Sequence, residues 1–416
     1  MYMDLPPWIL IALILVGAWA VLVALNKRGT LSKHNLEVSG PLLLWRTNYG
    51  KGTIRFIAHR FRPLWKKVGV ICIVISTVTM VFTAVMIIAQ AILIIRTPEV
   101  IPPDVGAGEM ILLPGLALPL TYGLVALIIA IVVHEFSHGI LSEAEGMNIK
   151  SLGLGVLVAL PLAFVEPDEE GIKNASSRSK MKMFAAGPAA NILVFVISFL
   201  VFTQILLPMF APNAEGIGIS ETIEGFPAAD AGMTGGEIIT HVGESGVKGI
   251  EDFRGKMAEF SPGDVVEIQT NKDAYTIELG VHPDDPGRAF LGVHLFPVTE
   301  FYAGLMHPIG FILPQVGTML PLLSPDFFGA GLVHRDVVLI ALQLVFWVGL
   351  LNFWLGAINM LPAKPFDGGH LMGEYVKMLI QRLGSRDEKV ANNISNWVSV
   401  LFILIYLGPI LLIVMT

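Results

Sequence analysis

The sequence predicts an α-helical polytopic membrane protein that carries a mainly β domain inserted between its spans. Of its 416 residues, 54% are hydrophobic and only 15% are charged, whereas soluble domains carry about 25% charged residues. The mean hydropathy is +0.69. Several runs of about 20 residues contain almost no charge, which is the length that a helix needs to cross a bilayer.

Six segments have the length and composition of membrane-spanning helices. They are Trp8–Leu25, Val68–Ile95, Leu120–Leu141, Met183–Leu207, Val337–Leu361 and Trp397–Met415. The first has no basic residue before it and no clear cleavage site, so we interpret it as a retained span. The apolar stretch near Phe301–Leu323 is interrupted by Pro308, Pro314 and Pro321. We expect it to lie at the interface or partly inserted, because proline breaks a crossing helix.

The distribution of Lys and Arg predicts one orientation of these spans. The loop Asn26–Lys67 holds ten basic residues and one acid, so we expect it in the cytoplasm. Alternation then places Lys150–Lys182 and Lys364–Lys389 inside, and the long segment between the fourth and fifth spans outside. We interpret the basic loop as a contact for anionic lipid, with docking of an acidic cytoplasmic partner as the alternative.

Composition also excludes several classes of protein. The net charge of −7 argues against nucleic acid as a partner. The single cysteine, Cys72, excludes a disulfide framework and a cysteine-based zinc site.

The stretch from about Pro212 to Val298 differs from its surroundings, because acidic residues far outnumber basic ones. Its short β-type runs include Glu237–Val242, Val265–Thr270 and Ala274–Val281. The order of Gly216–Ile219, a Pro-Ala-Ala turn at 227–229 and the strand at 236–239 resembles a PDZ domain, in which a strand and a helix form a peptide groove. We expect it to filter or dock substrates outside the membrane. A passive spacer is the alternative.

The third span ends in the motif His134-Glu135-Phe136-Ser137-His138. Residues four apart share one face of a helix, so both imidazoles can bind one metal ion while Glu135 handles a proton. Zinc suits nitrogen and carboxylate ligands, and ionisable groups within spans are functional candidates. The alternative is a pair of histidines placed at a helix end for the helix dipole, which leaves the glutamate and the spacing unexplained.

A zinc site with two histidines needs a third ligand, for which Asp367 is the best candidate. It lies just after the fifth span in a run from Asn359 to His370 that contains two prolines and a Gly-Gly pair. The prolines end the helix and the glycines permit close backbone approach, so the carboxylate could turn back into the bundle. An exposed Asp-Gly turn is the alternative, and His370 is the competing ligand.

Three motifs together resemble the site-2 proteases, a family of intramembrane zinc metalloproteases. They are the His-Glu-x-x-His of 134–138, the Gly-Pro-x-x-Asn of 187–191 and the Asn-x-x-Pro motif that runs from Asn359 to Gly368, with Phe366 where the family usually has leucine. The resemblance covers roughly Leu120 to Leu371.

The resemblance implies specific roles. His134, His138 and Asp367 would hold one Zn²⁺ per chain and Glu135 would be the general base. Asn359 would help to hold the developing oxyanion, and Asn191 would contact substrate or neighbouring helices. The substrate would be a transmembrane protein, already shortened by another protease. The chain would lie in the cell membrane, with the zinc towards the cytoplasm and the PDZ-like domain on the other side.

The segment Ser151–Leu162 is apolar, rich in glycine and too short to span as a helix. The resemblance implies a membrane-embedded β element here. We expect it to offer an edge strand, so that Val156 and Val158 pair with substrate backbone. A buried structural hairpin is the alternative.

These interpretations divide the chain into six parts, with a three-helix catalytic core. The parts are an N-terminal pair of spans with its basic loop (1–119), the first part of the core (120–211), the PDZ-like domain (212–298), an interfacial linker (299–336), the second part of the core (337–394) and a last span (395–416). A metal-ion transporter, or an inactive membrane scaffold that presents the PDZ-like domain, are the competing functions.

Overall fold

The computed structural model describes residues 7–97, 119–157, 160–329, 334–385 and 387–415. Among these residues, five helical segments are long and apolar enough to cross a membrane. They are α3 (Arg62–Arg96), α4 (Leu120–Glu145), α6 (Ser177–Val201) continued by π and 3-10 turns to Met209, α12 (Arg335–Asn359) and the stretch Glu388–Gly408 of α14 (Glu388–Met415). These five helices coincide with the second to sixth predicted spans.

The first predicted span forms α1 (Pro7–Lys27). Its part from Val16 to Lys27 is an apolar helix that is shorter than a crossing. Whether α1 spans the membrane therefore stays a prediction. The chain folds into two compact units, one formed by Met1–Phe195 with Leu351–Thr416 and the other by Val196–Leu350.

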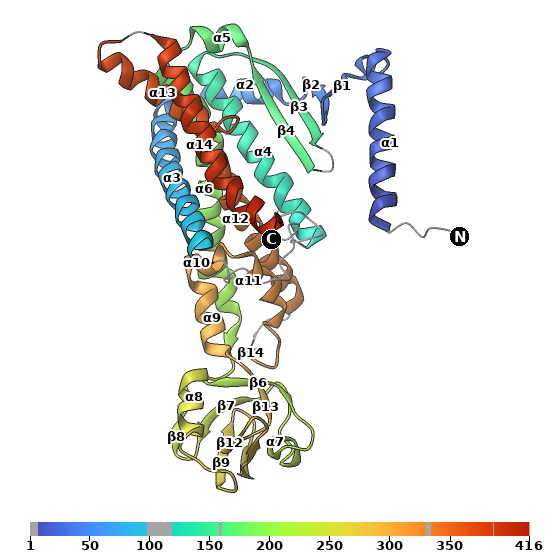
Figure 1. Cartoon of the computed structure of the whole chain (residues 1–416), viewed down its shortest axis with the longest axis vertical. Helices are drawn as coiled ribbons and strands as arrows, with labels where there is room; N and C mark the ends of the chain where they lie inside the picture. Colours follow the sequence, from blue (N-terminus) through green and yellow to red (C-terminus); the bar gives the residue numbers. More distant parts are fainter. Residues whose placement is uncertain (1–6, 98–118, 158–159, 330–333, 386, 416) are drawn as a thin grey trace. The chain divides into compact units, whose positions relative to one another are not determined.

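The first unit contains a four-stranded antiparallel sheet of order β1-β2-β3-β4 (Figure 1). Its strands are β1 (Leu36–Ser39), β2 (Leu42–Thr47), β3 (Ile149–Leu157) and β4 (Leu160–Pro167). The sequence predicts only the second pair, because β1 and β2 come from the basic loop, more than a hundred residues earlier. Trp45 of β2 lies opposite Leu154 of β3, which lies opposite Ala163 of β4.

The edge position expected for Val156 is wrong. Val156 lies opposite Leu43 on one side and Pro161 on the other, so β3 has a partner on both edges. The strands at the two edges of the sheet are β1 and β4. Val158 lies outside the described residues.

Short helices surround this sheet and the spans of the first unit. α2 (Lys51–Arg60) contacts α4, and α13 (Asp367–Arg382) contacts α14; α5 (Glu169–Asn174) follows β4. A 3-10 turn, Ser32–His34, leads into β1. α2 buries Ile54 and Ala58 completely, and Ile54 packs with Ile149 and Leu152 of β3. α2 therefore joins α4, the helix that carries the His-Glu-x-x-His motif, to the sheet.

The second unit contains a mainly β domain with its own core. Its main sheet has the order β10-β9-β7-β6-β13, with β8 paired to β7. In chain order the elements are β6 (Ile217–Thr222), α7 (Pro227–Asp230), β7 (Ile238–Val242), β8 (Ser245–Gly246), α8 (Ile250–Met257), β9 (Val265–Thr270), β10 (Ala274–Glu278), β11 (Gly280–His282), β12 (Asp285–Phe290) and β13 (Val293–Phe296). The three β-type runs expected from the sequence all form strands.

Short helices follow the β domain in place of a crossing helix. They are α9 (Val298–Met306), α10 (Pro308–Phe311), α11 (Pro314–Met319) and a 3-10 turn, Leu320–Leu322. Pro308, Pro314 and Pro321 each lie in the first turn of a helical piece, as proline prefers. The prolines thus divide this stretch into short helical pieces, as the sequence predicts, and its place at the membrane interface stays a prediction. The second unit also contains a short antiparallel pair of strands, β5 (Ala211–Pro212) and β14 (Phe328–Gly329).

The β domain has a buried carboxylate that links two of its strands. Glu237 is 2% exposed and accepts hydrogen bonds from the Thr234 backbone N–H and hydroxyl, the Thr270 hydroxyl and the Tyr275 hydroxyl. Burial alone would raise the pKa of Glu237, but these hydrogen bonds outweigh burial and hold the pKa below its ordinary value.

A Glu237→Gln variant should loosen the domain around β7 and β9. A glutamine keeps the shape but loses the charged acceptor, which costs about 1–3 kcal/mol. Because the folded-state pKa is lowered, this stabilisation is present above the unfolded pKa of about 4.3 and is lost as pH falls through the folded value. Hydrogen-exchange protection of β7 and β9 should therefore fall with acid in wild type and change less in the variant. Equal acid profiles would contradict the assignment; Glu278→Gln, at an exposed position, is the control.

Candidate metal centre

The two histidines of the motif lie on the second half of α4, one turn apart. His134 and His138 place their rings in a T-shaped contact with centroids 4.7 Å apart, and the Nε2 atoms are separated by 3.1 Å. His134 is 5% exposed. The i, i+4 spacing therefore produces the convergence that the sequence predicts.

Asp367 reaches the histidines because the chain folds back after α12. The helix ends at Asn359 and α13 begins at Asp367. A Cβ on Gly368 would lie 2.5 Å from the Leu361 carbonyl oxygen, and one on Gly369 would lie 2.3 Å from the Ala363 carbonyl carbon. Only glycine fits at such close approach. The Gly-Gly pair thus lets the first turn of α13 pack directly against the backbone of the loop that precedes it.

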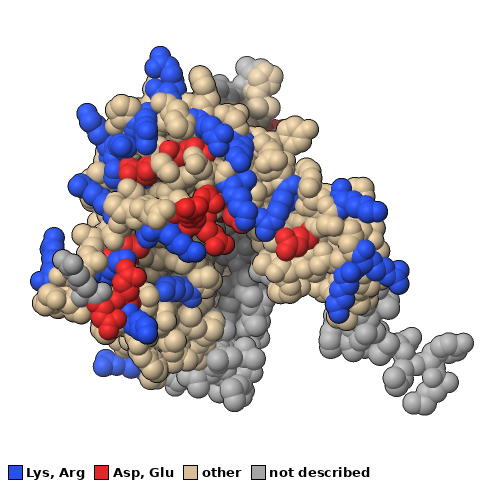
Figure 2. All heavy atoms as spheres, turned by 90° about the horizontal axis from the view of Figure 1, so that it is seen from above, with Lys and Arg blue, Asp and Glu red and all other residues tan. Residues whose placement is uncertain are grey.

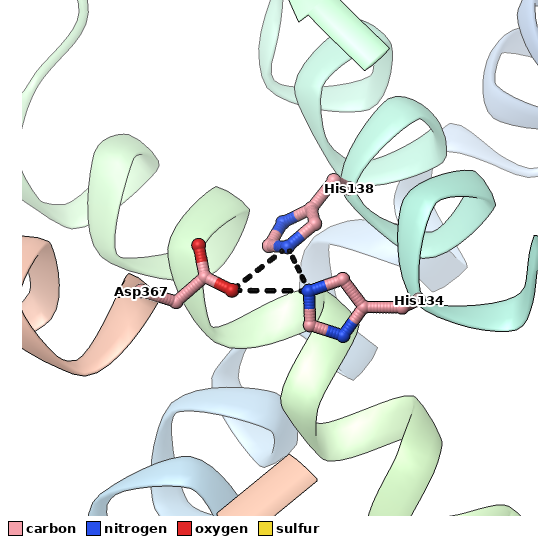
Figure 3. Close-up of side chains that lie close together, drawn as sticks. All are labelled: His134, His138 and Asp367. Carbon is pink, nitrogen blue, oxygen red and sulfur yellow. Dashed lines mark hydrogen bonds and ion pairs between the residues drawn. The ribbon is translucent and has the colours of Figure 1, made fainter. Parts of the chain in front are cut away.

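The three side chains point at one another (Figure 3). Asp367 Oδ2 lies 3.1 Å from His134 Nε2 and 3.1 Å from His138 Nε2. Among the described residues, these three form the group that could hold a metal ion. The competing candidate His370 is not part of this group; its ring stacks on Phe184, with centroids 4.9 Å apart.

The donor set fits a zinc ion. Nitrogen and oxygen ligands lie about 2.0–2.1 Å from zinc, and tetrahedral angles place them about 3.3 Å from one another, close to the distances found here. His138 Nδ1 lies 2.7 Å from the Met183 carbonyl oxygen. Since a carbonyl only accepts, Nδ1 carries the hydrogen, and the neutral ring keeps its Nε2 lone pair for a metal.

The backbone of α6 forms one wall of this centre. A Cβ on Gly187 would lie 2.4 Å from His138 Nε2 and 2.8 Å from His134 Nε2. Real Cβ atoms do not approach other atoms so closely, so any larger residue here must displace the histidines. Gly187 is the first residue of the Gly-Pro-x-x-Asn motif, and its role is to let α6 pass directly beside the ligand atoms.

The glutamate of the motif is held by the sheet. Glu135 Oε2 accepts a hydrogen bond of 2.9 Å from the backbone N–H of Val165, a residue of β4. This edge strand of the sheet is therefore tied to the residue that flanks both histidines. A half-buried carboxylate held in this way lies where it could receive a proton close to the ligand set.

The remaining predicted residues are placed differently. Asn191 is fully buried, and neither its Oδ1 nor its Nδ2 has a hydrogen-bond partner among the described residues. Asn359 donates one amide hydrogen to the Leu355 carbonyl in its own helix, which leaves its second hydrogen. Neither residue belongs to the group of metal-ligating side chains, so their roles stay predictions.

Two contacts of the site could not be predicted from the sequence. The Met183 carbonyl and the Val165 amide each contact a motif residue, but both are backbone groups, so the residue type carries no signal. Gly187 is different, because a glycine in a spanning helix predicts close packing, and the structure shows that what packs against it is the pair of histidine rings.

The fold and the site define a multi-pass membrane protein with a two-histidine, one-carboxylate metal centre of the metallohydrolase type. The chain belongs to peptidase family M50, the site-2 proteases, whose profile matches residues 122–406. It is 26% identical to an uncharacterized protein of Methanocaldococcus jannaschii, over 92% of this chain and 89% of that one.

Named zinc metalloproteases are also similar to this chain. Rip1 of Mycolicibacterium smegmatis is 25% identical over 59% of this chain and 82% of its own length. RasP of Shouchella clausii is 27% identical over 52% of this chain and 58% of its own length. Membership of this family implies a zinc ion, which is the metal that the donor set fits.

A Gly187→Ala variant should bind zinc at least about tenfold more weakly, as is typical when groups that orient ligands are lost. The added methyl group would occupy the space of His138 Nε2. Zinc content per chain, measured after dialysis against graded chelator, checks the prediction. Gly408→Ala is the matched control, because a Cβ there meets nothing within 4 Å. Wild-type zinc retention by the Gly187 variant would show that the histidines can move aside without loss.

Proposed function

We propose that this protein is an intramembrane zinc metalloprotease that hydrolyses peptide bonds within or near the transmembrane segments of membrane proteins. The observation that carries the proposal is that Asp367, at the start of α13, lies 3.1 Å from both His134 and His138, which belong to a helix apolar enough to cross the membrane. Ionisable groups are costly there unless they serve a function.

In the proposed mechanism Glu135 is the general base. When bound, zinc polarises the scissile carbonyl and lowers the pKa of water. The Glu135 carboxylate accepts the proton of the attacking water and later delivers it to the leaving amine. The Val165 N–H fixes the carboxylate, and the Met183 carbonyl fixes the His138 ring. The free amide hydrogen of Asn359 would donate to the developing oxyanion.

A helical substrate must give up its internal hydrogen bonds before it can be cut. We assign the replacement partners to β4, because it is an edge strand of the sheet and its Val165 amide already contacts Glu135. A substrate strand added to this edge would lie beside the general base. Asn191, buried with an unpaired amide, is a second group that could bind substrate backbone.

The β domain would act as a PDZ-like filter or docking site. A cavity of about 100 Å³ lies between α8 and the edge strand β13, lined by the apolar side chains of Phe253, Met257 and Val293 together with Arg254 and Arg288. A strand edge beside a helix is the arrangement that binds extended peptides. In the proposed topology the basic loop and the zinc lie towards the cytoplasm and this domain lies on the other side.

The catalytic proposal is tested with Glu135→Gln and Asp367→Ala on purified protein and a model single-span substrate. Glu135→Gln should keep about one zinc per chain and lose at least about a hundredfold in cleavage, the usual contribution of a general base. Asp367→Ala should lose both zinc and cleavage. Glu170→Gln, an exposed acid on α5, is the control. Cleavage by Glu135→Gln at the wild-type rate would remove the general-base assignment.

Deletion of residues 212–298 separates a filter from a passive spacer. If the β domain filters by size, the deleted protein should cut a full-length substrate that wild type leaves intact, while its rate on a pre-trimmed substrate stays within about twofold. Gel-based cleavage assays on the two substrates give this comparison. Loss of cleavage on both substrates, with normal zinc content, would contradict the filter.

A further inference from the structure

α2 combines two properties that rarely occur together on a helix exposed to water. Its inner face is apolar and buried, through Ile54 and Ala58. Its outer face carries Phe56, which is 68% exposed, and the chain continues with Phe61 and Leu64, which are 47% and 53% exposed. Large apolar side chains at such exposure mark an interaction surface.

The same short segment is strongly basic. Residues 51–67 contain six Lys or Arg residues and one histidine, and no acid. α3, a membrane-spanning candidate, begins at Arg62, two residues after α2 ends. α2 therefore lies where a span leaves the hydrocarbon, at the level of the lipid headgroups. Figure 2, which looks onto the end of the first unit that carries α2, shows many Lys and Arg side chains around the edge of this face.

A shallow and widely open hollow on α2 is lined by Gly52, Arg55, Phe56, His59 and Arg60. Gly52 adds to the open space, because a Cβ there would meet nothing within 4 Å. Two guanidinium groups and an imidazole thus border the hollow beside an exposed phenyl ring. Guanidinium groups bind phosphate oxygens in pairs of parallel hydrogen bonds.

The charges around the hollow do not balance. Arg55 and His59 share a single acid, the buried Glu143 of α4, at 3.4 Å each. Arg60 has no acidic partner among the described residues, and its guanidinium lies 5.4 Å from the centre of the Phe61 ring. An anion bound in the hollow would supply the missing charge.

We propose that this hollow binds the phosphate headgroup of an anionic phospholipid, with an acyl chain lying along Phe56. The exposed aromatic side chains favour a lipid over a free phosphate, which would gain nothing from them. The hollow is also connected, through Glu143, to α4, the helix that carries both histidines. Glu143 lies five residues after His138 on α4 and accepts the Ile149 N–H, where β3 begins, at 2.9 Å.

The test uses the full chain in mixed micelles of equal amounts of phosphatidylglycerol and phosphatidylcholine, with bound lipids counted by native mass spectrometry. Wild type should retain phosphatidylglycerol in preference. Arg60→Gln should weaken that retention about fivefold, the effect of one basic residue at a membrane surface, and Phe56→Ser should weaken it as well. Lys173→Gln, an exposed lysine on α5, is the matched control and should behave like wild type.

Each other result overturns the proposal. Equal retention of the two lipids, or wild-type retention by Arg60→Gln, removes the headgroup site. Wild-type retention by Phe56→Ser removes the acyl-chain contact. Displacement of the lipid by an excess of soluble glycerol phosphate shows a site for free phosphate instead. Both substituted side chains are exposed, and zinc content and monodispersity of each variant establish that it is folded.

Discussion

The catalytic unit depends on one constraint, which is that three electron-rich side chains must meet inside an apolar helix bundle. Two imidazole nitrogens and a carboxylate oxygen at 3.1 Å from one another are costly without a cation to bind. Backbone approach at Gly187, Gly368 and Gly369 makes this convergence possible. The family motifs thus supply two kinds of residue: side chains that can bind the metal, and glycines whose lack of a side chain lets the backbone come close.

A second set of contacts ties the metal centre to the basic loop at the N-terminal side. Glu143, buried at the end of the motif helix, is held by Arg55 and His59 of α2 and in turn holds the first amide of β3. β3 pairs with β4, whose Val165 amide holds Glu135. A loop outside the three motifs therefore supports the position of Glu135 through two strands and one buried acid.

Much of this architecture could be predicted from the sequence, for physical reasons that also explain the failures. Long apolar runs predict spans because a bilayer has a fixed thickness, and an i, i+4 pair of histidines predicts that both bind one metal ion. The four-stranded sheet escaped prediction because β2 and β3 are far apart in sequence, and strand pairing over that distance leaves no local pattern. For the same reason Val156 was expected at an edge that β2 in fact covers.

β1 forms the edge of this sheet opposite β4. The Asn26 side chain of α1 both donates to and accepts from the backbone of Val38, and the Leu36 amide donates to the Leu31 carbonyl. The outward N–H groups of β1 are thus already satisfied within the chain. Any extended polypeptide that lengthens the sheet must therefore add next to the catalytic helix, and the far side is closed to unproductive pairing.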